Sequence, residues 1–196
     1  MFDLDNAKIN TAGAYLCVQG LYPFSIGSQP HKGRIPVVRL GGHRETGETG
    51  WQCALREVQE ETGLQVRLLT PPATYLLPDG DRPETELEQI RWQHAGEQEE
   101  HAPLLVVAYP RRGETLLSLI YLARADELPV PSSEVKGLLL LTPEDIHRLC
   151  RERLTLEQYL ACGGKAILRH DFDQSLVLEP FLQLRLLSRI MMAGLT

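Results

Sequence analysis

Short runs of apolar residues, separated by turn-forming residues, recur along most of the chain. Runs rich in β-branched and aromatic residues predict strands, because these side chains pack well on a pleated surface. The predicted strands are Thr11–Gln19, Ile35–Leu40, Leu64–Leu69, Thr74–Leu77, Leu104–Tyr109, Thr115–Ala123 and Gly137–Leu141. Pro110–Glu114 contains a glycine between two of these runs and suits a hairpin. The stretch from Pro78 to Ala102 is polar and predicts a long insertion between strands.

Apolar residues spaced by three and four positions predict helices in other segments. The predicted helices are Thr49–Thr62, a segment that opens at Thr142-Pro143, and Leu178–Met192. The first is the best specified: Thr49 and Gln52 have the spacing of a capping box, and Gly63 can close the helix in a left-handed conformation. Strands and helices alternate without a clean βαβ repeat, which favours a mixed sheet covered by helices.

The composition indicates a globular chain that is long enough to bury a core. It has 196 residues, of which 43% are hydrophobic and 23% are charged. A net charge of -6 disfavours nucleic acid as a bulk partner. No apolar run is long enough to cross a bilayer and the N-terminus lacks the order of a secretory signal, so we expect a cytoplasmic protein with no membrane partner. The four cysteines lack zinc-ligand spacing and are expected to be reduced, mostly buried thiols.

Three glutamates gather on one side of the predicted helix Thr49–Thr62. At about 100° per residue, Glu57, Glu60 and Glu61 share an arc roughly 100° wide beside the apolar face. Like charges one turn apart cost a helix a few tenths of a kcal/mol, so helix propensity gives no reason for this arrangement. A hard divalent cation would give one. Mg²⁺ prefers carboxylate oxygens and is often completed by substrate phosphates, so this face would suit a diphosphate.

Two further features belong to this region, a tandem glycine before the helix and an arginine within it. Gly41 and Gly42 form a tandem glycine, which lets a backbone carbonyl approach a metal closely. Arg56 lies outside the carboxylate arc and could pair with Glu48, which would fix the preceding loop against the helix. We assign Arg56 a supporting role at the site.

The segment from Gly42 to Leu64, GHRETGETGWQCALREVQEETGL, resembles the Nudix box G-x5-E-x7-R-E-U-x-E-E-x-G-U, with U apolar, at every specified position. The resemblance implies a Nudix-like α/β/α sandwich with a mixed β-sheet, here with a helical C-terminal extension. It also implies metal ligands: the carbonyl of Gly41 and the carboxylates of Glu57 and Glu61, with Glu60 close by as a further metal or catalytic carboxylate. Many relatives have proline where this chain has Leu40, so the loop conformation is less certain than the carboxylates.

The resemblance further indicates Glu134 as the carboxylate that many relatives bring from outside the box, either as a metal ligand or as the general base. It lies just ahead of LLLLTPEDI, which resembles the family's late strand entering a helix. Glu99 and Glu100, in the polar insertion, are the rival candidates. The plain alternative is that Glu134 is only a loop carboxylate.

The resemblance implies a Nudix-type hydrolase domain at 1–146. Beyond His147 no family pattern is visible, and the helical pattern there predicts a helical C-terminal extension at 147–196 packed on the same domain. The expected activity is Mg²⁺-dependent cleavage, with Mn²⁺ as the alternative ion, of the pyrophosphate bond in a small nucleotide such as ADP-ribose or a nucleotide sugar. Two alternatives stay open: a nucleotide-sensing regulatory domain, and an enzyme that acts on RNA ends. The oligomeric state stays open as well, a homodimer included.

Overall fold

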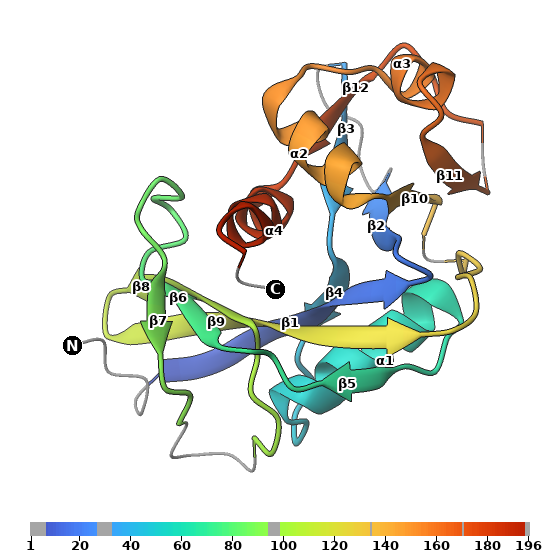
Figure 1. Ribbon diagram of the computed structural model, residues 1–196. Coiled ribbons are helices and arrows are strands. Elements are labelled where there is room, and N and C mark those ends of the chain that lie inside the picture. The colour runs from blue at the N-terminus through green and yellow to red at the C-terminus, as the bar shows by residue number, and fades with distance from the viewer. Residues whose placement is uncertain (1–6, 27–32, 94–98, 134, 170, 195–196) are drawn as a thin grey trace.

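The computed structural model describes residues 7–26, 33–93, 99–133, 135–169 and 171–194, which form two mixed sheets and four helices (Figure 1). The first sheet has the order β4-β1-β9-β8-β6-β7, with β5 also paired to β9, and the second has the order β11-β10-β2-β3-β12. The strands of the first sheet are β1 (Ala7–Val18), β4 (Leu40–His43), β5 (Arg67–Leu69), β6 (Thr74–Leu77), β7 (Glu88–Ile90), β8 (Leu105–Arg111) and β9 (Glu114–Ala125). Those of the second are β2 (Tyr22–Ile26), β3 (Arg34–Val38), β10 (Gly137–Leu141), β11 (Lys165–Leu168) and β12 (Val177–Pro180). The helices are α1 (Gly50–Thr62), α2 (Pro143–Arg151), α3 (Leu156–Ala161) and α4 (Leu182–Met192).

The central strands of the first sheet are buried on both faces. Along β8, Val106 and Ala108 join the cluster that packs against α1, whereas Leu105 and Val107 join the cluster that includes α4. Because successive side chains of a strand point to opposite faces, α1 covers one face of this sheet and the C-terminal part of the chain covers the other, as Figure 1 shows. The mixed α/β architecture predicted from the sequence is confirmed.

The predicted strand Ile35–Leu40 is in fact divided between the two sheets. Its first part belongs to β3, and the chain then passes through Arg39 into β4. β4 pairs antiparallel with β1, with Gly13 opposite Gly41. This crossing places the tandem glycine at the edge of the first sheet, beside α1.

The predicted final helix starts too early. Val177–Pro180 forms β12, which pairs in parallel with β3, and α4 begins only at Leu182. Sequence periodicity missed this strand because its partner lies far away in the chain. The short strands β7 and β11 were also not predicted. In the described part of the chain, no helix combines the length and apolar character that a membrane crossing requires.

Candidate active site

Local sequence signals define α1, which carries the three glutamates. The Thr49 hydroxyl accepts a hydrogen bond from the Gln52 N–H at 3.3 Å, and the Gln52 side chain accepts one from the Thr49 N–H at 2.9 Å. Gly63 ends the helix at a φ of 70°. The predicted capping box and C-terminal glycine are therefore both present. The buried side of α1, which includes Val58, packs against the first sheet and leaves the glutamates on an accessible side.

Two of the glutamates reach the tandem glycine. The Gly41 N–H donates to Glu61 Oε2 at 2.7 Å. The Glu57 carboxylate lies so close to Gly42 that a Cβ at that position would overlap it. Glycine at 42 therefore leaves space for a carboxylate. The structure brings Gly41, Glu57 and Glu61 together, one helical turn separating the two acids.

Arg56 links the loop before α1 to the glutamates. Its Nε donates to Glu48 Oε1 at 2.7 Å, which is the pair expected from the sequence. Its Nη1 also contacts Glu57 at 2.8 Å and Glu60 at 2.9 Å. The guanidinium therefore reaches these carboxylates, although Arg56 lies outside their arc on the helix. Nη2 donates to the His43 carbonyl at 3.0 Å. These hydrogen bonds hold the pKa of Glu48 below its usual range, and the carboxylates raise the pKa of Arg56.

The donor set on this side of α1 fits a hard divalent cation. Glu57 and Glu61 offer carboxylate oxygens, which are ligands that Mg²⁺ and Mn²⁺ accept. Glu60 is turned toward Arg56 and its side chain is 44% exposed. In the described ranges, no three His, Cys, Asp or Glu side chains stand close enough together to hold an ion. The site thus contains two converging acids, with Glu60 at its edge.

Glu134 lies outside the described residues, but the segment just before it contacts α1. The Val130 N–H donates to the Thr62 carbonyl at 3.0 Å, and the Ser132 N–H donates to the Glu61 carbonyl at 3.1 Å. This loop therefore runs along the C-terminal end of α1, the end at which Glu61 is found.

The rival carboxylate Glu99 is at the other end of α1. It accepts hydrogen bonds from the Gly50 N–H and from the Tyr121 hydroxyl, the latter at 2.9 Å. Gly50 begins the helix and lies about 10 Å along its axis from Glu57. Glu99 thus satisfies a free N–H at the positive end of the helix. Glu100 is exposed.

Sequence reasoning missed Arg39, which lies under the tandem glycine. This side chain is only 6% exposed, and Nη1 donates to the carbonyls of Ala12 at 3.0 Å and Leu40 at 3.1 Å. Side chains at Gly13 or Gly41 would overlap the guanidinium. The available signal was a cation within an apolar run, two positions before the tandem glycine.

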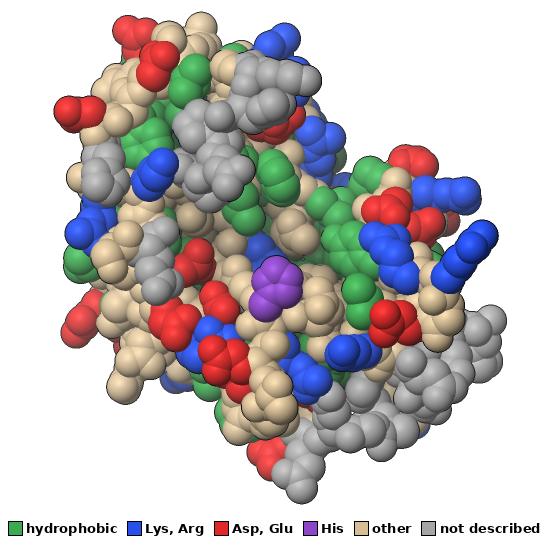
Figure 2. Space-filling model, turned by 180° about the vertical axis from the view of Figure 1, so that it is seen from behind, with side chains coloured by type: hydrophobic (Ala, Val, Ile, Leu, Met, Phe, Trp, Pro, Cys, Tyr) green, Lys and Arg blue, Asp and Glu red, His purple; other side chains and the backbone are tan. Residues whose placement is uncertain are grey.

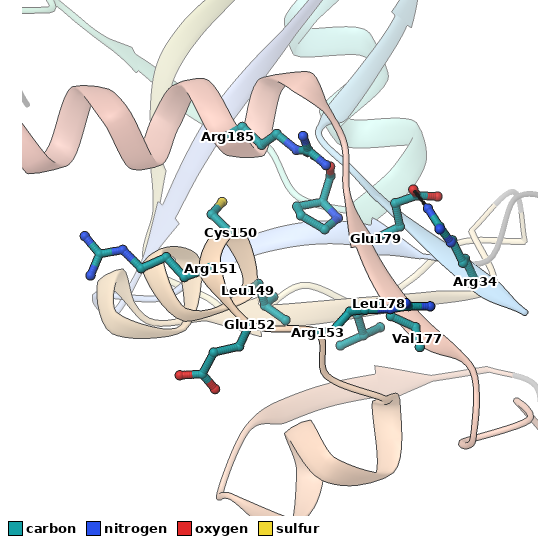
Figure 3. Close-up of a pocket in the computed structure, with 11 residues that line it drawn as sticks. Arg34, Leu149, Cys150, Arg151, Glu152, Arg153, Val177, Leu178, Glu179 and Arg185 are labelled. Atoms are coloured by element: carbon teal, nitrogen blue, oxygen red, sulfur yellow. Dashed lines mark hydrogen bonds and ion pairs between the residues drawn. The ribbon is translucent and has the colours of Figure 1, made fainter. Parts of the chain in front are cut away.

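A cavity of about 440 Å³ opens beside this loop, and its wall includes Arg39, Gly41 and Ser118. Figure 2 shows acidic and basic side chains gathered beside a histidine on one face of the molecule, next to a hollow in the surface. A second cavity, of about 360 Å³, lies between α2, β12 and α4 and is lined by several arginines (Figure 3). None of its lining residues comes from α1 or the tandem glycine.

One cysteine contacts the site: Cys53 Sγ accepts from Arg56 Nη2 at 3.7 Å and donates to the Gly42 carbonyl at 3.9 Å. All four cysteines are free, as expected, but only Cys53 is buried, whereas Cys17 and Cys150 are half-buried and Cys162 is exposed. Cys53 lies inside α1, where burial raises the pKa of its thiol to about 11. A thiol with that pKa is protonated at neutral pH and is a poor nucleophile.

The comparison with protein families agrees with the motif. The family model described as NUDIX domain matches residues 10–159. No curated protein matches the sequence. Among solved structures, a NUDIX-family hydrolase from Clostridium perfringens is 21% identical, with 69% of this chain and 82% of that chain covered and a TM-score of 0.45. An Ap4A hydrolase from C. elegans is 17% identical, with coverages of 70% and 82% and a TM-score of 0.42. A MutT protein from Methanosarcina mazei Go1 is 14% identical, with coverages of 74% and 83% and a TM-score of 0.44.

Proposed function

Because the chain belongs to the Nudix family, whose domain model matches residues 10–159, we propose that it hydrolyses the pyrophosphate bond of a nucleoside diphosphate linked to another moiety. ADP-ribose and nucleotide sugars are the substrate types that we expect. The observation that carries this proposal is the convergence of Glu57 and Glu61 on the tandem glycine. Two carboxylates at a close backbone approach suit a cation that holds a diphosphate.

We propose that the Gly41 carbonyl, Glu57 and Glu61 hold Mg²⁺ or Mn²⁺, with Glu60 assisting from the edge of the site. When bound, such an ion supplies positive charge to the phosphate oxygens and lowers the pKa of a bound water. Arg56 keeps Glu57 and Glu60 in place and partly neutralises their charge. It is a positioning residue in this proposal.

The reaction that we propose is a direct displacement. A water oxygen forms a bond to one phosphorus, the bond between that phosphorus and the bridging oxygen breaks, and the second phosphate leaves with the bridging oxygen. The water proton passes to a carboxylate, for which we propose Glu134 as general base. The position of Ser132 beside Glu61 supports this choice, because it brings the loop ahead of Glu134 to the correct end of α1.

The test of this function is a screen with Mg²⁺ or Mn²⁺ over ADP-ribose, nucleotide sugars, dinucleoside polyphosphates and nucleoside triphosphates. We expect turnover of at least one diphosphate-linked compound, and reaction in ¹⁸O-labelled water should place the label on a product phosphate. Label on a sugar carbon would show that a different bond breaks. Binding of nucleotides without any turnover would favour the nucleotide-sensing alternative, and turnover of RNA ends alone would favour the RNA-processing one.

Glutamine substitutions can separate Glu134 from Glu99, the rival that contacts α1. Glu134→Gln should lower kcat and kcat/KM together by roughly a hundredfold or more, because general-base catalysis contributes on that scale. Glu99→Gln should leave kcat close to the wild-type value and instead lower the free energy of unfolding by about 1 kcal/mol, because it weakens contacts to the start of α1. Steady-state kinetics and urea denaturation of both variants provide the measurement. The opposite pattern would place the base in the insertion.

A further inference from the structure

The strongest unexplained feature of the molecule is the burial of Arg39. It lies between β3 and β4, where the chain crosses from one sheet to the other, and its side chain is packed beneath Gly13 and Gly41. Its contacts are two backbone carbonyls on Nη1 and the Ser118 hydroxyl, at 3.5 Å, on Nη2. A guanidinium has five N–H donors, so these contacts leave hydrogen-bonding capacity unused.

This cation has no ion-pair partner among the residues that the structure describes. Glu61 and Glu57 act on its charge from a distance. A guanidinium stays protonated in proteins, so a largely buried positive charge lies at the wall of the cavity. Burying an unpaired charge costs free energy, and an anion bound beside Arg39 would offset that cost.

The wall of the cavity that Arg39 lines combines hydrogen-bonding and apolar side chains. Its polar side chains include those of Asn10, Thr11, Ser118 and Arg111, and its apolar ones include Leu116 and Phe181. Arg111 is partly committed, since it pairs with Asp81 at 2.8 Å. The lining residues include no aspartate or glutamate. This set of side chains therefore suits an oxyanion better than a cation.

The far side of the cavity comes from the C-terminal part of the chain. Phe181 and Gln183 line it, and the Gln183 carbonyl accepts a hydrogen bond from the Tyr15 hydroxyl at 2.7 Å. That contact ties the start of α4 to β1. A ligand in this cavity would therefore lie between the first sheet and the start of α4, with the proposed metal ligand Gly41 in the cavity wall.

We propose that this cavity binds a further oxyanion of the substrate, a phosphate or a carboxylate beyond the two phosphates joined by the cleaved bond, and that Arg39 and Ser118 are its ligands. The inference rests on the proposed function, because the anion belongs to the same substrate. It predicts that nucleotides with an additional phosphate or an acidic distal group bind better than neutral analogues. Arg39 is the specificity-determining residue of this assignment.

The first test measures anion binding without turnover. Inorganic phosphate is titrated into the ¹⁵N-labelled protein in EDTA, with sodium chloride of equal ionic strength as the reference. Saturable shifts of the Gly13 and Gly41 amide signals, next to Arg39, are the expected result. Shifts confined to residues around Arg153, in the arginine-lined cavity of Figure 3, would place the anion elsewhere and overturn the proposal, as would no shift at all. Because the metal is chelated, this outcome is independent of whether the protein hydrolyses any nucleotide.

Thermal unfolding of variants gives the second test. Phosphate should raise the Tm of the wild type and of the control Arg153→Met, and this increment should disappear in Arg39→Met and be reduced in Arg39→Lys, which keeps the charge but loses the planar fork. Equal increments in the wild type and Arg39→Met would refute the assignment. If Arg39→Met does not fold, the amide shifts of the wild type decide the question.

The source of the oxyanion is resolved by paired ligands. In one experiment, acetate replaces phosphate in the titration to test whether a carboxylate binds. In another, competition experiments compare the affinity for UDP-glucuronate with that for UDP-glucose, and the affinity for NADP⁺ with that for NAD⁺. In the wild type, we expect at least one of the two more acidic ligands to bind tenfold or more tightly than its partner. In Arg39→Met, the two ligands of that pair should bind with equal affinity. Equal affinities within both pairs in the wild type would count against an additional anion on the substrate.

Discussion

Glu57→Gln and Glu61→Gln are each expected to lower kcat by roughly three orders of magnitude, because several kcal/mol of transition-state stabilisation would be lost with a metal ligand. The fold should survive both changes. Neither side chain belongs to the buried face of α1, and a glutamine at 61 retains an oxygen that can accept from the Gly41 N–H. The measurements are steady-state kinetics with Mg²⁺ and the Tm of each variant.

A suitable control is Glu157→Gln, which removes an exposed carboxylate from α3, outside the site. It should leave kcat and Tm unchanged. Near-normal turnover in either the Glu57 or the Glu61 variant would show that the helix does not bind the metal in the way that we propose.

Gly41→Ala should destabilise the protein by about 3 kcal/mol or more and should also abolish turnover. Gly41 has a φ of 136°, which side chains rarely adopt, and a Cβ there would overlap both the Arg39 guanidinium and the Ala12 carbonyl. The cost therefore combines backbone strain with overpacking. Urea denaturation gives the free energy of unfolding.

Gly47→Ala is the matched control for this variant. Gly47 has a φ of 87° and no atom within 4 Å of an added Cβ, so its substitution reports backbone strain alone, about 1 kcal/mol. Equal losses in the two variants would mean that the packing around Gly41 contributes nothing.

The parts of the site that the sequence predicted are the parts specified by near neighbours. Thr49, Gln52 and Gly63 act within one or two helical turns, so the limits of α1 follow from spacing alone. The placement of Glu57 and Glu61 on one side follows from the helical period.

The parts that escaped prediction depend on contacts between distant segments. Leu178 fits a helical pattern as well as a strand, and only the pairing of β12 with β3 decides between them. Glu99 could be identified as a candidate, but its hydrogen bond to the Gly50 N–H depends on how the insertion docks. The burial of Arg39 likewise requires strands β1 and β9, whose residues Ala12 and Ser118 surround it.

The pairing of β3 with β12 also bears on biosynthesis. Arg34 pairs with Val177, so one edge of β3 lacks its partner until most of the polypeptide has left the ribosome. An open strand edge is a template for pairing with another chain, and translation at about 5–20 residues per second keeps it open for several seconds. During synthesis, β3 therefore keeps one open edge until the segment 177–180 completes the second sheet.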